Sequence, residues 1–261
     1  MLGYIYRQQL GQLLNAKRIL LTLFGALAIG GLCLVYLNAR GNAAPVEHTY
    51  VRLSEAIIIR IAALVCAIYT MNVVSAEIQQ KTIVYLVTVP VKRSVMFLGR
   101  ILAAGTASAL ASILFVLIAG LVAFKSQAFG AAAPLLLRDC AAVGLGAFAY
   151  CGIYAVFSLM LNHALLYSLL FAFGWESLVP NMPGDLYKGS ILRHIISAAQ
   201  HPEIPRAPNG VTGTIQRAFD TTFYIHPTTS MIVLLAIPIV TFAFGAFWFE
   251  RNEYVPREDY E

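Results

Sequence analysis

The most chemically mixed stretch in the front half of the chain is residues 77–100, between two long apolar runs. Its charged side chains and single proline are Glu77, Lys81, Pro90, Lys92, Arg93 and Arg100. Glu77 and Lys81 have the i, i+4 spacing and order that stabilise a helix, and Pro90 suits the first turn of a following helix. Two interpretations stay open for this stretch. It is either a simple amphipathic connector between membrane helices or a docking helix for a cytoplasmic partner.

The sequence lacks the motifs of the common catalytic sites. Its only Lys-[Ser/Thr] pairs, Lys81-Thr82 and Lys125-Ser126, do not follow the glycine pattern of a P-loop, so the chain cannot hold ATP in that way. HExxH and GxSxG do not occur, and neither do the paired aspartates expected of a membrane phosphotransferase. The sequence therefore gives little support to an enzyme.

Metal and disulfide chemistry find little support either. The four cysteines lie within apolar runs and form no CxxC pair, so we interpret them as small buried hydrophobic residues: Cys33, Cys66, Cys140 and Cys151. The five histidines are scattered over predicted loops, and we interpret them as solvated or structural: His48, His163, His194, His201 and His226. No metal site is predicted.

Two ionisable residues fall inside apolar runs, where a charge is costly and is usually paired or functional. Arg60 lies near the start of one run and Glu176 near the end of another, so they are candidates for an intramembrane charge pair. The alternative is that each side chain snorkels to the lipid headgroups, because each lies close to a helix end.

Aromatic and polar residues at helical spacing form two further candidate faces. Tyr69 and Asn72 share one helix face, and Tyr167 and Phe171 share a face of another helix. The two charged residues of these helices point the other way. The four residues are candidates for lining a transport path, and the alternative is that they only pack between helices.

The composition of the chain requires a membrane to position these residues. The chain is 59% hydrophobic and 12% charged, whereas a soluble domain is about 25% charged. Several apolar runs are long enough to cross a hydrocarbon core of ~30 Å, which takes ~20 helical residues. The net charge of +5 is explained by basic loops beside the membrane, so membrane lipid and not nucleic acid is the expected partner.

The predicted fold is all-α, a polytopic membrane protein with a single transmembrane domain over residues 1–261. Six spans are predicted at about 19–37, 56–74, 95–124, 140–161, 164–180 and 229–249. Residues 1–18 are amphipathic and predict an interfacial helix. The longer polar connections are predicted as loops at 38–55 and 125–139 and an outer segment at 181–228 with short helices at 190–200 and 214–223.

The positions of the basic residues predict the orientation, because short cytoplasmic loops are enriched in Lys and Arg. One side carries nine: Arg7, Lys17, Arg18, Lys81, Lys92, Arg93, Arg100, Arg251 and Arg257. The opposite side carries four in its short loops: Arg40, Arg52, Lys125 and Arg138. Both termini and the loop after the second span are therefore predicted to be cytoplasmic.

The loop after the second span resembles that of the ABC-2 type permease subunits of ABC transporters. In that family an acidic residue ends the second span, and a threonine and a line such as L-x-[S/T]-x-P-V-x-R follow. A glycine and a basic residue then enter the third span. The matching residues here are Glu77, Thr82, the segment 86–93, Gly99 and Arg100. Lys81 departs from the pattern, since the family often has glycine there, but the six-span layout is similar.

The resemblance implies a transporter subunit of the prokaryotic cytoplasmic membrane, and many such transporters are exporters. Two permeases, identical or homologous, would pair and bind two ABC ATPase subunits. Those subunits would hold ATP and Mg, and this chain would hold no cofactor. Closure of the ATPases would act on the coupling residues Glu77, Lys81, Thr82, Pro90 and Arg93.

The resemblance also implies a role for the outer segment 181–228 as a lid or as a docking site for an extracytoplasmic partner. A different interpretation is a non-transporting membrane scaffold or sensor subunit, whose outer segment binds a partner. Substrate-stimulated ATPase activity of the complex would distinguish a transporter from a scaffold.

Overall fold

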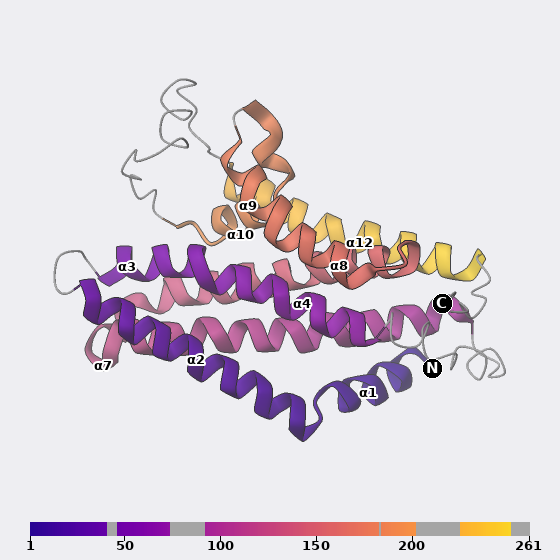
Figure 1. Cartoon of the computed structure of the whole chain (residues 1–261), viewed down its shortest axis with the longest axis horizontal. Helices are drawn as coiled ribbons and strands as arrows, with labels where there is room; N and C mark the ends of the chain where they lie inside the picture. The colour runs from indigo at the N-terminus through magenta and orange to yellow at the C-terminus, as the bar shows by residue number, and fades with distance from the viewer. Residues whose placement is uncertain (41–45, 74–91, 183, 202–224, 252–261) are drawn as a thin grey trace.

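The computed structural model describes residues 1–40, 46–73, 92–182, 184–201 and 225–251. Almost all of these residues are helical, and no strand occurs among them. The prediction of an all-α chain is confirmed. Most helices run lengthwise in one bundle, and the N-terminus lies at the same end as the end of the last helix, α12 (Pro227–Arg251) (Figure 1).

The first two helices meet at a bend, at the junction around Asn15 (Figure 1). α1 (Leu2–Leu13) is the predicted amphipathic helix, and α2 (Ala16–Arg40) is the first long apolar helix. α2 exposes large apolar side chains, among them Leu20 and Phe24, which are 72% and 70% exposed. An apolar surface of this kind needs lipid or another membrane protein to cover it.

A second rod runs antiparallel to α2. It consists of α3 (Val46–Leu53), the π-helical turn η1 (Ser54–Ile58) and α4 (Ile59–Val73). Two electrostatic contacts fix its direction: Tyr50 lies near Cys33, and Tyr69 lies near Arg18. Isolated π-helical turns in α-helices are rare and often lie at functional sites.

The loop predicted at 38–55 is wrong over its second half, which is helical. Tyr50 and Val51 are buried there, although polar residues such as Glu47 surround them in the sequence. The hydroxyl of Tyr50 donates to a buried partner, Asp139, that lies far away in the sequence. Local polarity gives no sign of this tertiary contact.

α7 (Arg93–Met160) is helical throughout its 68 residues but folds back on itself as a hairpin. Ser108 Oγ lies 3.0 Å from Cys151 Sγ, and the side chain of Phe148 fills the space beside Gly105. The predicted loop at 125–139 is therefore wrong, since the chain reverses within helical structure. Pro134 lies inside α7, close to where the chain reverses.

The returning half of α7 ends in the short turn that the sequence predicts at 161–163. The elements that follow it are short: α8 (Ala164–Leu170), the π-helical turn η2 (Phe171–Trp175), α9 (Glu176–Leu178), and the 3-10 helices η3 (Val179–Asn181) and η4 (Gly184–Gly189). α10 (Ile191–Ala198) is the short helix predicted at 190–200. The helix predicted at 214–223 lies outside the described residues.

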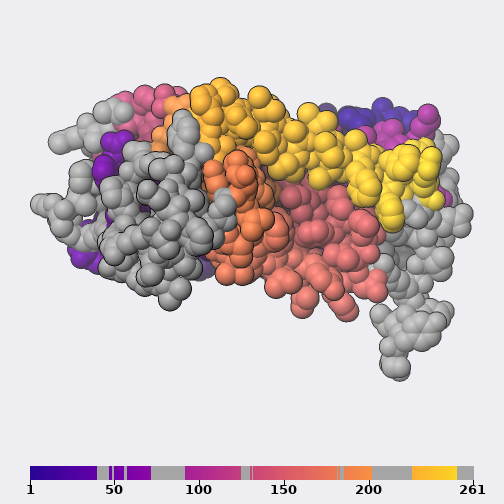
Figure 2. Space-filling model, turned by 90° about the horizontal axis from the view of Figure 1, so that it is seen from above, coloured from indigo at the N-terminus to yellow at the C-terminus, as the bar shows by residue number. Residues whose placement is uncertain are grey.

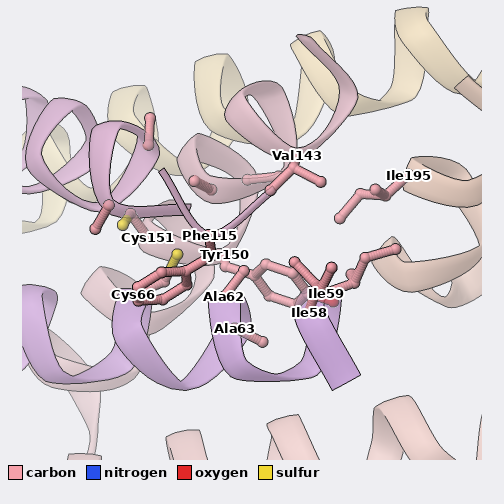
Figure 3. Packing of buried hydrophobic residues seen from close by; sticks show 14 of the residues in the cluster. Ile58, Ile59, Ala62, Ala63, Cys66, Phe115, Val143, Tyr150, Cys151 and Ile195 are labelled. Atoms are coloured by element: carbon pink, nitrogen blue, oxygen red, sulfur yellow. The ribbon is translucent and has the colours of Figure 1, made fainter. Parts of the chain in front are cut away.

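Small residues let the helices of the core approach closely, as is common in membrane bundles. Cys66 of α4 and Cys151 of α7 lie next to each other in this core (Figure 3). Both are free thiols. Next to Cys151 along α7, Gly152 leaves room for Thr241 of α12. α12 covers one face of the bundle lengthwise, beside the segment from α8 to α10 (Figure 2).

Four helices of the described chain are long and apolar enough to cross a membrane: Ala16–Ala39, Arg93–Phe124, Ala132–Met160 and Pro227–Arg251. Two shorter apolar helices, Ile59–Met71 and Ala164–Leu178, occupy the places of the second and fifth predicted spans. The two halves of α7 are largely buried, whereas α2 and α12 expose most of their surface. α7 is therefore the centre of the bundle.

Candidate functional site

α1 and the start of α7 form a joint at the N-terminal end of the bundle. Tyr6 donates its hydroxyl hydrogen to Thr106 Oγ1 at 3.2 Å. Gly99 lets Ile5 approach so closely that a Cβ at position 99 would lie 3.0 Å from the Ile5 Cγ2 atom. The amphipathic helix is therefore seated on the helix that directly follows the predicted coupling loop.

Four of the predicted coupling residues, Glu77, Lys81, Thr82 and Pro90, lie outside the described residues, and their role stays a prediction. Arg93 is the first residue of α7 and is partly buried. Lys92 precedes it with an extended backbone, at φ −59° and ψ 130°.

The predicted path-lining residues lie on α4, α8 and η2, and α4 packs against both of the others. Tyr69 is buried, and nothing is described of the Asn72 side chain. Tyr167 is 41% exposed on α8. Phe171 stacks on Trp175 and meets Tyr154 edge to face, with ring centroids 6.3 and 6.2 Å apart. These contacts place Phe171 in an aromatic cluster, and a path along these residues stays a prediction.

Arg60 and Glu176 lie near each other, but each has another hydrogen-bond partner. Arg60 Nη1 donates to Ser177 Oγ at 2.7 Å, and the guanidinium acts electrostatically on the neighbouring Glu176 carboxylate. Both residues directly follow a π-helical turn, η1 or η2, by one or two positions. The Glu176 carboxylate is 2% exposed and is fully engaged with the next segment of the chain.

Glu176 caps the N-terminus of α10. Its carboxylate accepts hydrogen bonds from Ser190 Oγ at 2.6 Å and from the backbone N–H groups of Ile191 and Leu192 at 3.0 and 3.1 Å. A carboxylate is favourable there because the first N–H groups of a helix have no partner within the helix. Arg193 adds two hydrogen bonds to the Pro180 carbonyl. The buried charge therefore positions α10.

A second polar cluster lies at the far end, which we define as the end opposite the N-terminus, where Tyr50, Glu55, Asp139 and His201 meet. Tyr50 donates to Asp139 Oδ2 at 2.7 Å. His201 Nε2 lies 2.6 Å from Asp139 Oδ1, and His201 Nδ1 lies 3.4 Å from Glu55 Oε1. The side chains of His201 and Asp139 are each 1% exposed. The cluster joins α3, η1 and α7 to His201, which lies three residues after the end of α10.

Two histidines of the far end differ in their pKa because their partners differ. Burial alone would lower the pKa of His201, but hydrogen bonds and charge from Asp139 and Glu55 outweigh it and raise the pKa to about 9. His194 lies against the Ser230 hydroxyl and the Lys188 carbonyl, without a carboxylate. Burial lowers its pKa. His201 is therefore cationic at neutral pH and His194 is neutral.

Sequence reasoning missed the far-end cluster, although one signal was present. Asp139 is the only acidic residue between Glu77 and Glu176. An isolated carboxylate at the start of an apolar helix needs a partner when it is buried. The partner, His201, was interpreted only as a loop histidine, because it lies 62 residues away in the sequence.

The comparisons with known proteins decide the family. Residues 14–174 match the family described as ABC-2 family transporter protein. The match covers more than half of the 261 residues. The chain belongs to this family. No curated protein matches the sequence.

Membership of the ABC-2 family has three direct consequences. The chain is a transmembrane permease of an ABC transporter, embedded in a membrane through its apolar helices. It is the membrane component and not itself the ATPase. It associates with ABC ATPase subunits. The matched region runs from the start of α2 into η2. It therefore includes Glu55 and Asp139 of the far-end cluster but not His201.

Proposed function

We propose that this ABC-2 permease is the membrane half of a prokaryotic ABC exporter with six membrane crossings. Contacts between helices support the count, because neighbouring spans run in opposite directions. Tyr50 lies against Phe124, Gly120 against Leu136, and Gly152 against Phe242. With α3–α4 and α8–α9 counted as crossings, the N-terminus and the end of α12 share one side. The excess of basic residues there makes that side cytoplasmic.

The coupling proposal rests on one observation, the seat of α1 on α7. The segment that carries Glu77, Lys81 and Thr82 joins α4 to α7, and α1 packs on α7 only a few residues after Arg93. A push on this segment by a closing ATPase would therefore act on α1 and α7 together. Because α7 folds back through the whole bundle, its movement would reach the far end.

We propose further that two permeases, identical or homologous, pair in the membrane and bind two ATPase subunits that hold ATP and Mg. The exposed apolar faces of α2 and α12 leave room for both lipid and a second permease. Tyr69, Asn72, Tyr167 and Phe171 would line the path of the cargo. The far end and the segment 181–228 would then face outward.

The test uses the permease purified with its ATPase subunits in mild detergent. Charge reversal by Glu77→Lys or Arg93→Glu is expected to lower ATPase recovery with the permease and to abolish substrate-stimulated ATP hydrolysis in reconstituted vesicles. Lys188→Glu is the matched control, because Lys188 is an exposed cation on η4 that pairs with Asp185, and η4 is not part of the predicted coupling segment.

Two outcomes would overturn the proposal. If both charge reversals leave the complex and transport intact, residues 77–93 do not couple the permease to the ATPase. If the intact complex hydrolyses ATP without any stimulation by cargo, the alternative of a non-transporting scaffold or sensor subunit is favoured.

A further inference from the structure

The far-end cluster requires a charged histidine, as its hydrogen-bonding groups show without reference to titration. Ionised carboxylates only accept hydrogen bonds. His201 directs Nε2 to Asp139 and Nδ1 to Glu55. Both contacts are hydrogen bonds only if both ring nitrogens carry a hydrogen, which is the imidazolium form. Tyr50 satisfies the second oxygen of Asp139.

The backbone before His201 adopts an unfavourable conformation that places this side chain. Gln200 has φ 54°, and within the described residues it is the sole non-glycine residue with a positive φ. The His201 N–H bonds to the Ile196 carbonyl and the Gln200 N–H to the Ser197 carbonyl, which is the Schellman arrangement at a helix C-terminus. Glycine is preferred at that position because a Cβ is strained there. The turn directs His201 into the carboxylates.

Three of the contacts that hold α10 to the bundle lie at its start, in its middle and just past its end. Glu176 caps its N-terminus, and His194 in its middle contacts Ser230 of α12. The His201 contact holds the C-terminal end of α10. It joins a cation to two carboxylates, Asp139 on α7 and Glu55 on η1. Buried pairs of this kind are costly to leave with one partner missing.

We propose that His201, as an imidazolium held between Asp139 and Glu55, is an ionic latch that fastens α10 over the far ends of α7 and η1. The proposal goes beyond the transport function and does not depend on the cargo or the ATPase. Within the described ranges, no group of three His, Cys, Asp or Glu side chains has the geometry to hold a metal ion. The cluster is therefore interpreted as an ion-pair contact.

The titratable groups around the latch come from each element packed on it. Asp139 and Glu55 act directly on His201, and Tyr50, Cys140 and Cys33 lie one contact further away, around the tyrosine hydroxyl. Because the pKa of His201 is raised from its usual 6.5 to about 9, the latch is complete below about pH 6.5. It is lost as the pH rises through about 9, where the imidazolium loses its proton.

The test is backbone hydrogen exchange of α10 in the purified full-length permease, corrected for the intrinsic pH dependence of exchange. At about pH 7, His201→Gln is expected to raise the exchange rate of the α10 amides by about tenfold, since a charge-assisted contact is lost. In the unaltered protein, the same acceleration is expected as the pH rises through about 9. His201→Gln should show no such step.

His226→Gln is the matched control, because His226 is exposed, lies just before α12 and contacts Thr228. It should leave α10 exchange and its pH step unchanged. Exchange of the α7 amides reports whether each variant is folded. Equal α10 exchange in His201→Gln and the unaltered protein at about pH 7 would overturn the latch. If the variant does not fold, the pH series of the unaltered protein decides, and the absence of a step up to about pH 10 overturns it.

Discussion

The two ends of the bundle use ionisable residues in opposite ways. At the N-terminal end, Arg7 on α1 and Lys17 at the start of α2 are exposed. At the far end, Asp139, Glu176 and His201 are buried and bonded to other elements of the same chain. Exposed charges are available to lipid headgroups or a partner, whereas buried, bonded charges are already satisfied. The N-terminal end is therefore suited to contacts with lipid or a partner, and the far end to contacts that hold the chain's own helices together.

This difference gives each end a separate expected response to mutation. Loss of a charge at the far end should change stability strongly, because it leaves buried polar groups without partners. A change at the N-terminal end should alter coupling to a partner more than overall stability, because the charges there are exposed and contribute little to folding. Three substitutions test this comparison.

The largest effect is expected for Asp139→Ala. It removes the common partner of Tyr50 and His201 and leaves a buried imidazolium with only the longer contact to Glu55. Breaking a buried ion pair by removing one partner costs about 3–5 kcal/mol. The measurement is the free energy of unfolding of the purified permease in mixed micelles.

Asp185→Ala is the matched control for this prediction. Asp185 also pairs with a cation at the far end, but its side chain is 85% exposed, and exposed pairs contribute about 0–1 kcal/mol. If the two alanine variants lose similar stability, burial does not distinguish the charges of the far end and the comparison between the two ends fails.

An intermediate effect is expected for Gly99→Leu at the N-terminal end. The leucine would collide with Ile5, because even a Cβ there lies within 3.0–3.2 Å of that side chain. Overpacking costs about 1–3 kcal/mol, and here it is relieved when α1 lifts from α7. We expect α1 to become sensitive to protease, and cargo-stimulated ATP hydrolysis to fall.

Gly11→Leu is the control, because nothing lies within 4 Å of a Cβ at Gly11, which is on α1 itself. It should leave α1 seated and coupling intact. If Gly99→Leu lifts α1 and ATP hydrolysis still responds to cargo, the seat of α1 is structural and does not transmit force. That result would leave the residues 77–93 as the sole candidates for coupling.

The sequence predicts what depends on local pattern. Apolar runs located the long helices, amphipathic spacing predicted α1, and the periodicity of residues 190–200 predicted α10. The family followed from a motif around Glu77 and Pro90, and the match over residues 14–174 confirms the family. These features are encoded by residues that are close together in the chain.

The features that sequence reasoning missed depend on contacts between distant residues. Residues 46–53 look like a polar loop until Tyr50 meets Asp139, which is 89 residues away. His201 looks like a loop histidine until it meets Glu55, 146 residues away. Periodicity and composition carry no information about such pairs. Only the fold shows that Asp139 and Glu55 bind the other residues of the far-end cluster.

The smallest effect is expected for Gln200→Gly, and its sign is informative. A Cβ in the left-handed region costs about 1–2 kcal/mol, and glycine loses about 0.5–1 kcal/mol of that gain through its greater freedom in the unfolded chain. We therefore expect the glycine variant to be more stable by about 0.5–1 kcal/mol, with α10 exchange unchanged or slower. Gln200→Val is the opposite control, because a β-branched residue is disfavoured at φ 54°.

The pair of variants separates two explanations of the strained turn. If the turn exists to deliver His201 to Asp139, relieving the strain keeps the latch and Gln200→Val weakens it, so α10 exchange accelerates in the valine variant alone. If Gln200→Gly also loosens α10, the glutamine side chain itself contributes to closure. The far end would then depend on an exposed residue, and the contrast with the N-terminal end would be weaker than the buried charges alone indicate.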